Sequence, residues 1–195
     1  MRLAIFDFDG TITNTDSFID FLLHTHGPAK TLFSAVVLSP LIVMYALKLY
    51  PREKLKNMTL TLFYAGTEEA ALQKLAAEFA TESIPKMVRP SALEKIKWHK
   101  AQGHKIVVVS ASPEIYLKDW VGFYNLDLIG TKLEVAMGRI TGLIDGTNCY
   151  GEEKIRRIKE KYNLADFEYV YAYGDNEGDK ALKSIANEFH YRLFK

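Results

Sequence analysis

Beyond Pro90 the chain alternates between short apolar runs and longer amphipathic stretches, and this alternation constrains its fold more than any other feature. The run KIVVV at residues 105–109 is almost entirely β-branched, as expected for a strand buried on both faces of a parallel sheet. Strand patterns also occupy residues 168–173 and 189–194, and an apolar run at residues 3–8 precedes them all. Strands that alternate with helices indicate a doubly wound, Rossmann-like α/β fold with a mostly parallel sheet.

The remaining patterns complete this sheet and its connections. Residues 127–135 and 139–144 are expected to pair as an antiparallel hairpin about Met137-Gly138. Apolar positions recur at helical spacing in the segments between the strands. The helices expected in this part of the chain cover residues 92–102, 113–124, 151–162 and 177–186.

Directly after the first strand, this alternation is interrupted by a long stretch in which every pattern is helical. Gly27-Pro28 is expected to break the first helix of this stretch. We therefore expect two units. An α/β core is formed by residues 1–15 and 86–195, and an all-helical insert by residues 16–85.

Residues 31–47 of the insert carry no charge and are mostly apolar. Their length is borderline for a helix that crosses a bilayer, and Pro40 near the middle is expected to kink or break one. Three interpretations are open: a buried helix pair within the insert, a surface that contacts lipid, and a membrane span. Pro40 and the slightly negative mean hydropathy of the chain favour the buried pair.

Composition excludes several classes of protein. With 25 Lys and Arg against 24 Asp and Glu, the net charge is +1, so the chain lacks the basic character of a nucleic-acid-binding domain. A lone cysteine, Cys149, rules out a disulfide within the chain and a cysteine zinc site. The start MRLAIFDFDG lacks the apolar region of a signal peptide. We therefore expect a cytoplasmic protein, with a peripheral position at the inner membrane surface as the alternative, and a monomer is favoured.

Acidic residues follow two of the expected strands, Asp7 and Asp9 after the first and Asp175 and Asp179 after the fourth. Taken singly, Asp9 suits a turn, and Asp175 and Asp179 suit the cap of a helix. In open parallel sheets, however, ligands bind beyond the carboxyl ends of the strands. Carboxylates that converge there repel one another unless a cation neutralises them, and Mg²⁺ prefers carboxylates together with water and phosphate. The sequence therefore predicts a magnesium and phosphate site at this edge.

Two further residues supply groups for phosphate. Ser110 ends the strand at residues 105–109 and can donate a hydrogen bond to a phosphate oxygen. Lys154 lies in the first turn of a later helix and can provide the cation that a transferring phosphoryl group needs. The helix expected to open at Pro113 offers free backbone N–H groups, and Ser112 is interpreted as its cap.

These motifs occur in a characteristic order: DFDGT after the first strand, S after the second, K on a later helix and GDxxxD after a further strand. In this order they resemble the haloacid dehalogenase-like (HAD) hydrolase superfamily. The resemblance covers the whole core, and the helical insert looks like the superfamily's C1-type cap. VVVSASPE, GTKLEV with GRITG, and GEEK are similar to segments of subfamily IB, which contains phosphoserine phosphatase.

The resemblance implies a Mg²⁺-dependent phosphatase that works through an aspartyl phosphate. Asp7 would be the nucleophile, and Asp9 the general acid and then the general base. Asp7, the Asp9 backbone carbonyl and Asp175 would hold Mg²⁺, with Asp179 supporting or sharing that site. Because an acid at position 9 can protonate an alkoxide leaving group, a dehalogenase is disfavoured. The residues implied to bind phosphate are Asp7, Gly10, Thr11, Ser110, Ala111 and Lys154, the last of which would also restrain Asp7.

The expected partner is a small phosphorylated metabolite or a phospholipid headgroup. Asp16 falls near the position where phosphoserine phosphatases place an acid for the substrate amine, and Arg52 or Lys56 is expected to face a carboxylate. Those enzymes have Glu for Asp16 and commonly Asn for Gly178, which argues against phosphoserine.

Two alternatives stay open. The apolar run and the basic residues after it resemble phosphatidylglycerophosphate phosphatases, which suggests a membrane-surface enzyme that contacts phospholipid through the cap. The other alternative is a phosphoacceptor or binding module with little turnover. Asp9 argues against the latter, because a stable aspartyl phosphate needs no general base.

Overall fold

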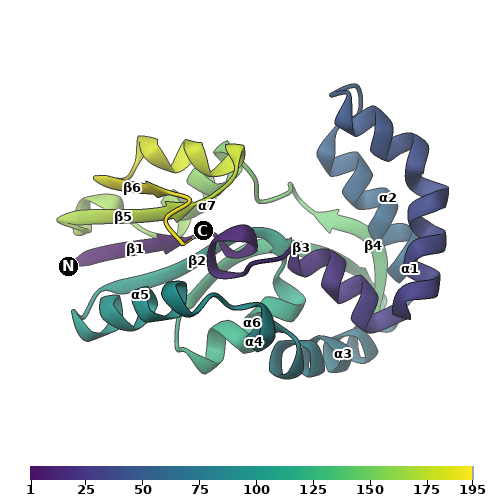
Figure 1. The fold of residues 1–195 in the computed structure, drawn as a ribbon, viewed down its shortest axis with the longest axis horizontal. Coiled ribbons are helices and arrows are strands. Elements are labelled where there is room, and N and C mark those ends of the chain that lie inside the picture. Colours follow the sequence, from purple (N-terminus) through teal and green to yellow (C-terminus); the bar gives the residue numbers. More distant parts are fainter. Residues whose placement is uncertain (195) are drawn as a thin grey trace.

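The computed structural model describes residues 1–194, which contain one six-stranded sheet with helices on both faces (Figure 1). The strand order is β4-β3-β2-β1-β5-β6. Neighbouring strands are parallel except for β3 and β4, which form the expected antiparallel pair. The prediction of a doubly wound, mostly parallel α/β sheet is therefore confirmed. The strands are β1 (Arg2–Phe6), β2 (Lys105–Pro113), β3 (Asp127–Ala136), β4 (Arg139–Asp145), β5 (Tyr169–Gly174) and β6 (Glu188–Tyr191).

The central strands β1 and β2 are apolar on both faces, and both faces are covered. Ala4 and Phe6 of β1 belong to one buried cluster together with residues of α5 (Pro90–Ala101) and α6 (Glu114–Phe123). Leu3 and Ile5 alternate with them along the strand and belong to a second buried cluster with residues of α7 (Glu152–Lys161). Burial on both faces explains why these strands read as continuous apolar runs rather than as alternating patterns.

Four further α-helices lie between β1 and β2 in the sequence. In Figure 1, α1 and α2 form a hairpin at one end of the molecule; α2 packs on β4, and α3 packs on α6. These segments are helical as expected, whereas the division of the chain into a core and a cap at residues 16–85 stays a prediction. The helices here are α1 (Ser17–Ala46), α2 (Arg52–Tyr64), α3 (Glu69–Glu82) and α4 (Ile84–Met87).

The long helix α1 bends at Gly27 and continues through Pro40. Gly27 has φ 74° and ψ 169°, which are backbone angles outside the helical region, and Pro28 then begins the second half. The break expected at Gly27-Pro28 is present, whereas the break expected at Pro40 is not. Pro40 is solvent-exposed, so the carbonyl that its ring displaces can turn toward water.

The second half of α1 is largely uncovered, and the favoured prediction of a buried helix pair at residues 31–47 is wrong. Within this described segment only Ser34 and Leu38 are buried, and Phe33 is 69% exposed. Among residues 1–194, α1 is the helix long and apolar enough to cross a membrane, and 11% of its most apolar window is buried. The hairpin with α2 projects beyond the sheet, so α2 covers one narrow stripe of α1 and leaves the rest open.

Candidate active site

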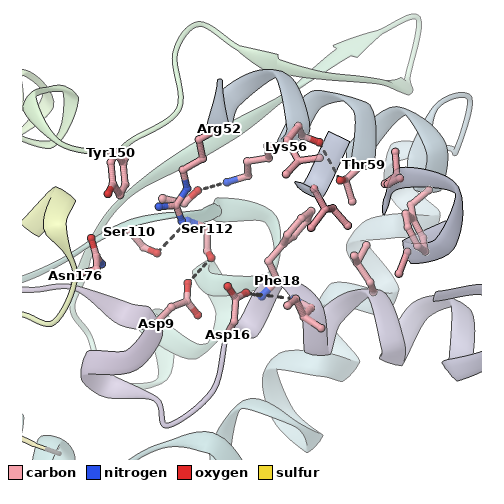
Figure 2. A pocket seen from close by; sticks show the side chains of 18 of the residues that line it. Asp9, Asp16, Phe18, Arg52, Lys56, Thr59, Ser110, Ser112, Tyr150 and Asn176 are labelled. Atoms are coloured by element: carbon pink, nitrogen blue, oxygen red, sulfur yellow. Dashed lines mark hydrogen bonds between the residues drawn. The ribbon is translucent and has the colours of Figure 1, made fainter. Parts of the chain in front are cut away.

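A cavity of about 400 Å³ opens at the carboxyl ends of β1, β2 and β5 and extends along α1 and α2. In Figure 2, Asp9, Ser110 and Asn176 gather at one end of it, and Thr59 of α2 lies toward the other. Of the described residues predicted to form the site, four lie outside the lining: Gly10, Thr11, Asp175 and Asp179. The predicted residues that line the cavity are Asp7, Asp9, Asp16, Arg52, Lys56, Ser110, Ala111 and Lys154.

Asp7 lies at the floor of the cavity, directly after β1. Its backbone N–H donates to the Tyr173 carbonyl at 2.9 Å, which continues the pairing with β5 by one residue. Asp7 is 3% exposed, and its carboxylate accepts a hydrogen bond from Lys154 Nζ at 2.6 Å. Lys154 also donates to Asp179 Oδ1 at 2.7 Å, so one buried ammonium joins carboxylates from two strand ends.

Burial and charge act in opposite directions on this cluster. Burial raises the pKa of Asp7 well above its usual range, and Asp179 adds to this, although the Lys154 ammonium lowers it in part. For Lys154, burial lowers the pKa, but the charges of Asp7 and Asp179 outweigh that effect and raise it. Lys154 is therefore a cation at neutral pH, and its ammonium only partly offsets the effect of burial on Asp7.

The acidic cluster fits a hard divalent cation. Ligand atoms of Asp7, Asp175 and Asp179 lie within 4.8 Å of one another. Gly10, at φ 76°, makes room for one of them, since a Cβ at this position would lie 2.5 Å from Asp175 Oδ2. Several carboxylate oxygens at one point, with room for water and phosphate in the adjoining cavity, are the donor set that Mg²⁺ prefers.

Asp179 supports this cluster rather than facing the cavity. One oxygen of its carboxylate accepts from Lys154, and the other accepts from the backbone N–H groups of Asp175 and Asn176, at 3.0 and 3.1 Å. With Asn176 it forms a reciprocal capping box at the start of the short helix Glu177–Ser184. The capping role considered for Asp179 from the sequence is thus present alongside its ion pair.

Asp9 is held by two donors from different parts of the chain. The Ser17 backbone N–H donates to Asp9 Oδ1 at 2.7 Å, and the Ser112 hydroxyl donates to Asp9 Oδ2. Burial raises the pKa of Asp9, and the nearby charge of Asp16 raises it further, against the opposing effect of these hydrogen bonds. A carboxyl group with a raised pKa is suited to give and take protons near neutral pH.

Ser112 does not cap a helix, which corrects the interpretation made from the sequence. The register with β3 shifts between Val109 and Pro113, and β2 extends through this irregularity to Pro113. The helix α6 therefore begins at Glu114, with Pro113 as an N-cap that makes no side-chain hydrogen bond. The extension of β2 turns the Ser112 hydroxyl toward Asp9.

A buried hydroxyl network lies behind Asp9. Ser17 Oγ lies 3.2 Å from Tyr116 Oη and within 3.5 Å of Ser112 Oγ, and all three side chains are buried. Burial, together with the Asp9 charge, raises the pKa of Tyr116 well above its usual range, so its hydroxyl keeps its proton. The sequence analysis missed Ser17 and Tyr116, since nothing in their local pattern marks them.

Lys56 ties the helical hairpin to the sheet. Its Nζ donates to the Ala111 carbonyl and, at 3.0 Å, to Asn148 Oδ1. Burial and the charge of Arg52 lower the pKa of Lys56 to about 8. Ser110, 1% exposed, accepts from the Ser112 backbone N–H at 3.0 Å. Lys56, Ser110 and Ala111 thus form a single connected wall of the cavity.

The other predicted substrate residues lie at the rim. Asp16 Oδ1 accepts from the backbone N–H groups of Phe18 and Ile19, at 3.0 and 3.3 Å, and so caps α1. Arg52 lies over the Tyr150 ring, 4.4 Å from its centroid. That ring also explains Gly178, because a Cβ there would lie 2.4 Å from Tyr150.

Two residues remain to be placed. Thr11 Oγ1 is buried and has no hydrogen-bond partner among residues 1–194, and its contact with phosphate, like that of Gly10, stays a prediction. Asn176, which the sequence analysis did not single out, places Nδ2 3.4 Å from Asp7 Oδ2 and lines the cavity. Its place after Asp175 in the GDxxxD motif was the available signal.

Comparison with known proteins places the chain among relatives over its whole length. A family model described as haloacid dehalogenase-like hydrolase matches residues 4–182. Protein CicA of Caulobacter vibrioides is 37% identical over 195 residues, covering 99% of this chain and 86% of that protein. Histidinol-phosphatase of Neisseria meningitidis serogroup C is 26% identical over 198 residues, covering 96% and 88%. A solved structure of a Bordetella pertussis Tohama I protein with unknown function has a TM-score of 0.83 at 25% identity, covering 96% and 88%.

Proposed function

The chain belongs to the haloacid dehalogenase-like hydrolase family, and from that premise we propose that it is a Mg²⁺-dependent phosphatase that passes the phosphoryl group through Asp7. One observation carries the proposal: Asp7 lies on the cavity floor in an ion pair with buried Lys154, and Asp9 faces the same cavity. The name of the Neisseria relative, a histidinol-phosphatase, supports phosphate ester hydrolysis as the reaction.

In the first step a carboxylate oxygen of Asp7 attacks phosphorus. The bond between phosphorus and the leaving oxygen breaks, the electron pair goes to that oxygen, and Asp9 gives it a proton. The raised pKa of Asp9 suits this role, because burial favours the protonated form that a general acid needs. Hydrogen bonds from Ser17 and Ser112 hold its carboxyl group in place.

In the second step water breaks the acyl phosphate. Asp9, now ionised, takes a proton from water as the oxygen attacks phosphorus, and the bond between phosphorus and Asp7 breaks to restore the carboxylate. Lys154 lies beside Asp7 throughout, and its ammonium offsets negative charge on the transferring group. Ser110 lines the same end of the cavity and offers a hydroxyl to phosphate oxygens.

Mg²⁺ would be held by Asp7, Asp175 and the Asp9 carbonyl, with Asp179 as the residue that orients the loop and Lys154. When bound, the ion would supply positive charge against the phosphate oxygens and help to keep Asp7 ionised. Asp7 needs such help, since its own surroundings raise its pKa.

The substrate we propose is a phosphorylated metabolite or a phospholipid headgroup, in a cytoplasmic enzyme whose cap is formed by residues 16–85. Phosphoserine is disfavoured, because the Asp16 carboxylate is engaged at the start of α1 and Tyr150 fills the space beside Gly178. Arg52 and Lys56 remain the candidate contacts for an anionic part of the substrate.

The proposal is tested by phosphate release from an aryl phosphate, with Mg²⁺ and with EDTA. Wild type should be active with Mg²⁺ only, and Asp7→Asn should lose about three orders of magnitude or more in rate, as removal of a covalent nucleophile does elsewhere. Asp145→Asn, a matched change at an exposed acid, should behave as wild type. Equal activity in Asp7→Asn would exclude the nucleophile assignment. A long-lived phosphoprotein without phosphate release would favour a phosphoacceptor instead.

A further inference from the structure

The second half of α1 presents a large apolar surface to solvent. Seven of its residues, counting two just after it, are more than half exposed, and we call them the apolar patch, which includes Val37. The others are Leu32, Phe33, Val36, Val43, Leu47 and Leu49. Exposed apolar groups scattered singly are ordinary, but a contiguous set along one helix marks an interaction site.

Apolar side chains occur on all sides of this half of the helix. Thr31, Ala35, Leu38 and Ile42 form a stripe at helical spacing that lines the cavity, and the apolar patch occupies the other sides. A helix that is apolar all round is stable in a protein core or in contact with lipid, and α2 covers only one stripe of this one.

The dimensions favour a helix lying at a membrane surface over one that spans it. Residues 31–46 make a helix of about 24 Å at 1.5 Å per residue, shorter than the roughly 30 Å of a bilayer's hydrocarbon core. The first half of α1 is held in the active site, where Ser17 N–H bonds Asp9, so it is not available to extend a span.

The positive charge around the apolar patch favours an anionic membrane surface as its partner. Residues 21–67 contain five Lys and Arg and one acid, although the whole chain is nearly neutral. The one acid, Glu53, accepts a hydrogen bond from the Asn148 backbone N–H. Exposed Lys30 precedes the patch, while exposed Lys48 and Lys54 follow it, where they can meet anionic headgroups. A second copy seated on the patch would bring like charges together.

The cavity changes character along its length in the way an amphiphilic substrate requires. Asp7, Ser110 and Lys154 line it together with Leu38 and Ile42 of α1. Figure 2 shows Ser110 at one end and Thr59 of α2 toward the other. The wall next to the apolar patch is thus apolar, and the reactive end lies deepest toward the sheet.

We infer that the apolar patch docks the protein onto a bilayer containing anionic lipids, and that the cavity takes a phosphomonoester lipid from that bilayer. The choice of lipid as substrate rests on the proposed phosphatase function, whereas the docking does not. Phosphate enters toward Asp7, and the apolar chain lies along the stripe of α1.

Docking is tested by flotation with vesicles of phosphatidylcholine and phosphatidylglycerol in equal parts, and with vesicles of phosphatidylcholine alone. Wild type should float with the anionic vesicles and much less with the neutral ones. The double variant Phe33→Glu/Val36→Glu changes two side chains that do not line the cavity. It should weaken vesicle binding more than about tenfold, because two apolar side chains that the bilayer would bury are replaced by charged ones. Phe123→Glu, at a side chain 68% exposed on α6, is the matched control and should bind as wild type.

Three results would overturn docking. Wild type that stays with the unbound fraction on both vesicles would do so, as would a double variant that floats equally well. A dimer seen by sedimentation that dissociates in Phe33→Glu/Val36→Glu would assign the patch to a second copy of the chain.

The lipid source of the substrate is tested by comparing phosphatidic acid in anionic vesicles with glycerol 3-phosphate in solution. Phosphate release from the vesicles should be at least about tenfold faster, and the double variant should lose that advantage but keep its rate on a soluble aryl phosphate. Equal or faster release from glycerol 3-phosphate would contradict the lipid substrate. No release from any ester, with flotation intact, would reject the phosphatase proposal and leave docking standing.

Discussion

Removal of the Lys154 charge should destabilise the protein strongly. Lys154→Met keeps most of the length and volume of the side chain and deletes the ammonium. Asp7 and Asp179 would then lie buried at the same point with no positive charge between them. The change isolates the electrostatic role of Lys154 from its packing.

The size of the effect follows from burial and distance. Lys154 is 1% exposed and holds two carboxylates at 2.6 and 2.7 Å. Removing one partner of a buried ion pair typically costs about 3–5 kcal/mol, because the remaining charge keeps its desolvation penalty. Since a domain is usually stable by about 5–15 kcal/mol, the variant should lose a large part of its stability.

Urea unfolding followed by circular dichroism at pH 7, in EDTA, measures this loss. Lys159→Met on the exposed side of the same helix is the matched control and should change stability by no more than about 0.5 kcal/mol. Lys154→Arg keeps the charge and should lose less than Lys154→Met. A loss below about 1 kcal/mol in Lys154→Met, or one equal to that of Lys159→Met, would refute the view that Lys154 neutralises this cluster.

The Ser112 hydroxyl and the His99 imidazole give two further predictions, one on the reaction rate and one on the pH dependence of stability. Ser112→Ala removes a hydrogen bond to the Asp9 carboxylate, so kcat should fall about tenfold or more with KM little changed, and Ser112→Thr should retain most of the rate; an equal loss in both would contradict the positioning role. Burial, with the charges of His104 and Lys95, lowers the pKa of His99 to about 3 from 6.5. Below pH 6.5 His99 therefore binds a proton in the unfolded chain but not in the folded one. The free energy of unfolding should fall as the pH drops below 6.5. Between pH 7 and pH 5 the loss should reach at most about 2 kcal/mol by urea unfolding, and His99→Gln should lack it; the same pH dependence in both proteins would contradict this assignment.

The residues at the carboxyl edge of the sheet could be predicted from the sequence, because each strand end is visible locally and the parallel topology brings the ends together. Apolar runs ending in Asp7, Ser110 and Asp175 indicate parallel strands, and parallel strands end at one edge. The structure places Asp7, Asp175 and Asp179 within 4.8 Å of one another there. Their part in catalysis stays a prediction until activity is measured.

The groups that hold Asp9 could not be predicted, because they depend on a register that the sequence does not specify. Ser112 reaches Asp9 because β2 continues past its β-branched run through a shifted pairing with β3. Ser-Pro is also a common start of a helix, so the local pattern favoured the wrong assignment. Ser17 and Tyr116 meet only when α1 and α6 are packed together.

The exposure of α1 could not be predicted for a related reason. Whether an apolar helix is buried depends on how many elements lie against it, and average hydropathy does not report that number. Here α2 packs against α1, but within the described residues 31–46 only Ser34 and Leu38 are buried, so the apolar patch stays open.

The central claim is that the phosphoryl group passes through Asp7, and trapping the intermediate tests it most directly. The enzyme is mixed with a phosphate ester and Mg²⁺, quenched in acid at short times, and reduced with borohydride, which converts an aspartyl phosphate to homoserine. We expect homoserine at position 7 by peptide mass spectrometry in wild type, and none in Asp7→Asn. Steady phosphate release with unmodified Asp7 at every quench time, or with homoserine at another acid, would contradict the mechanism.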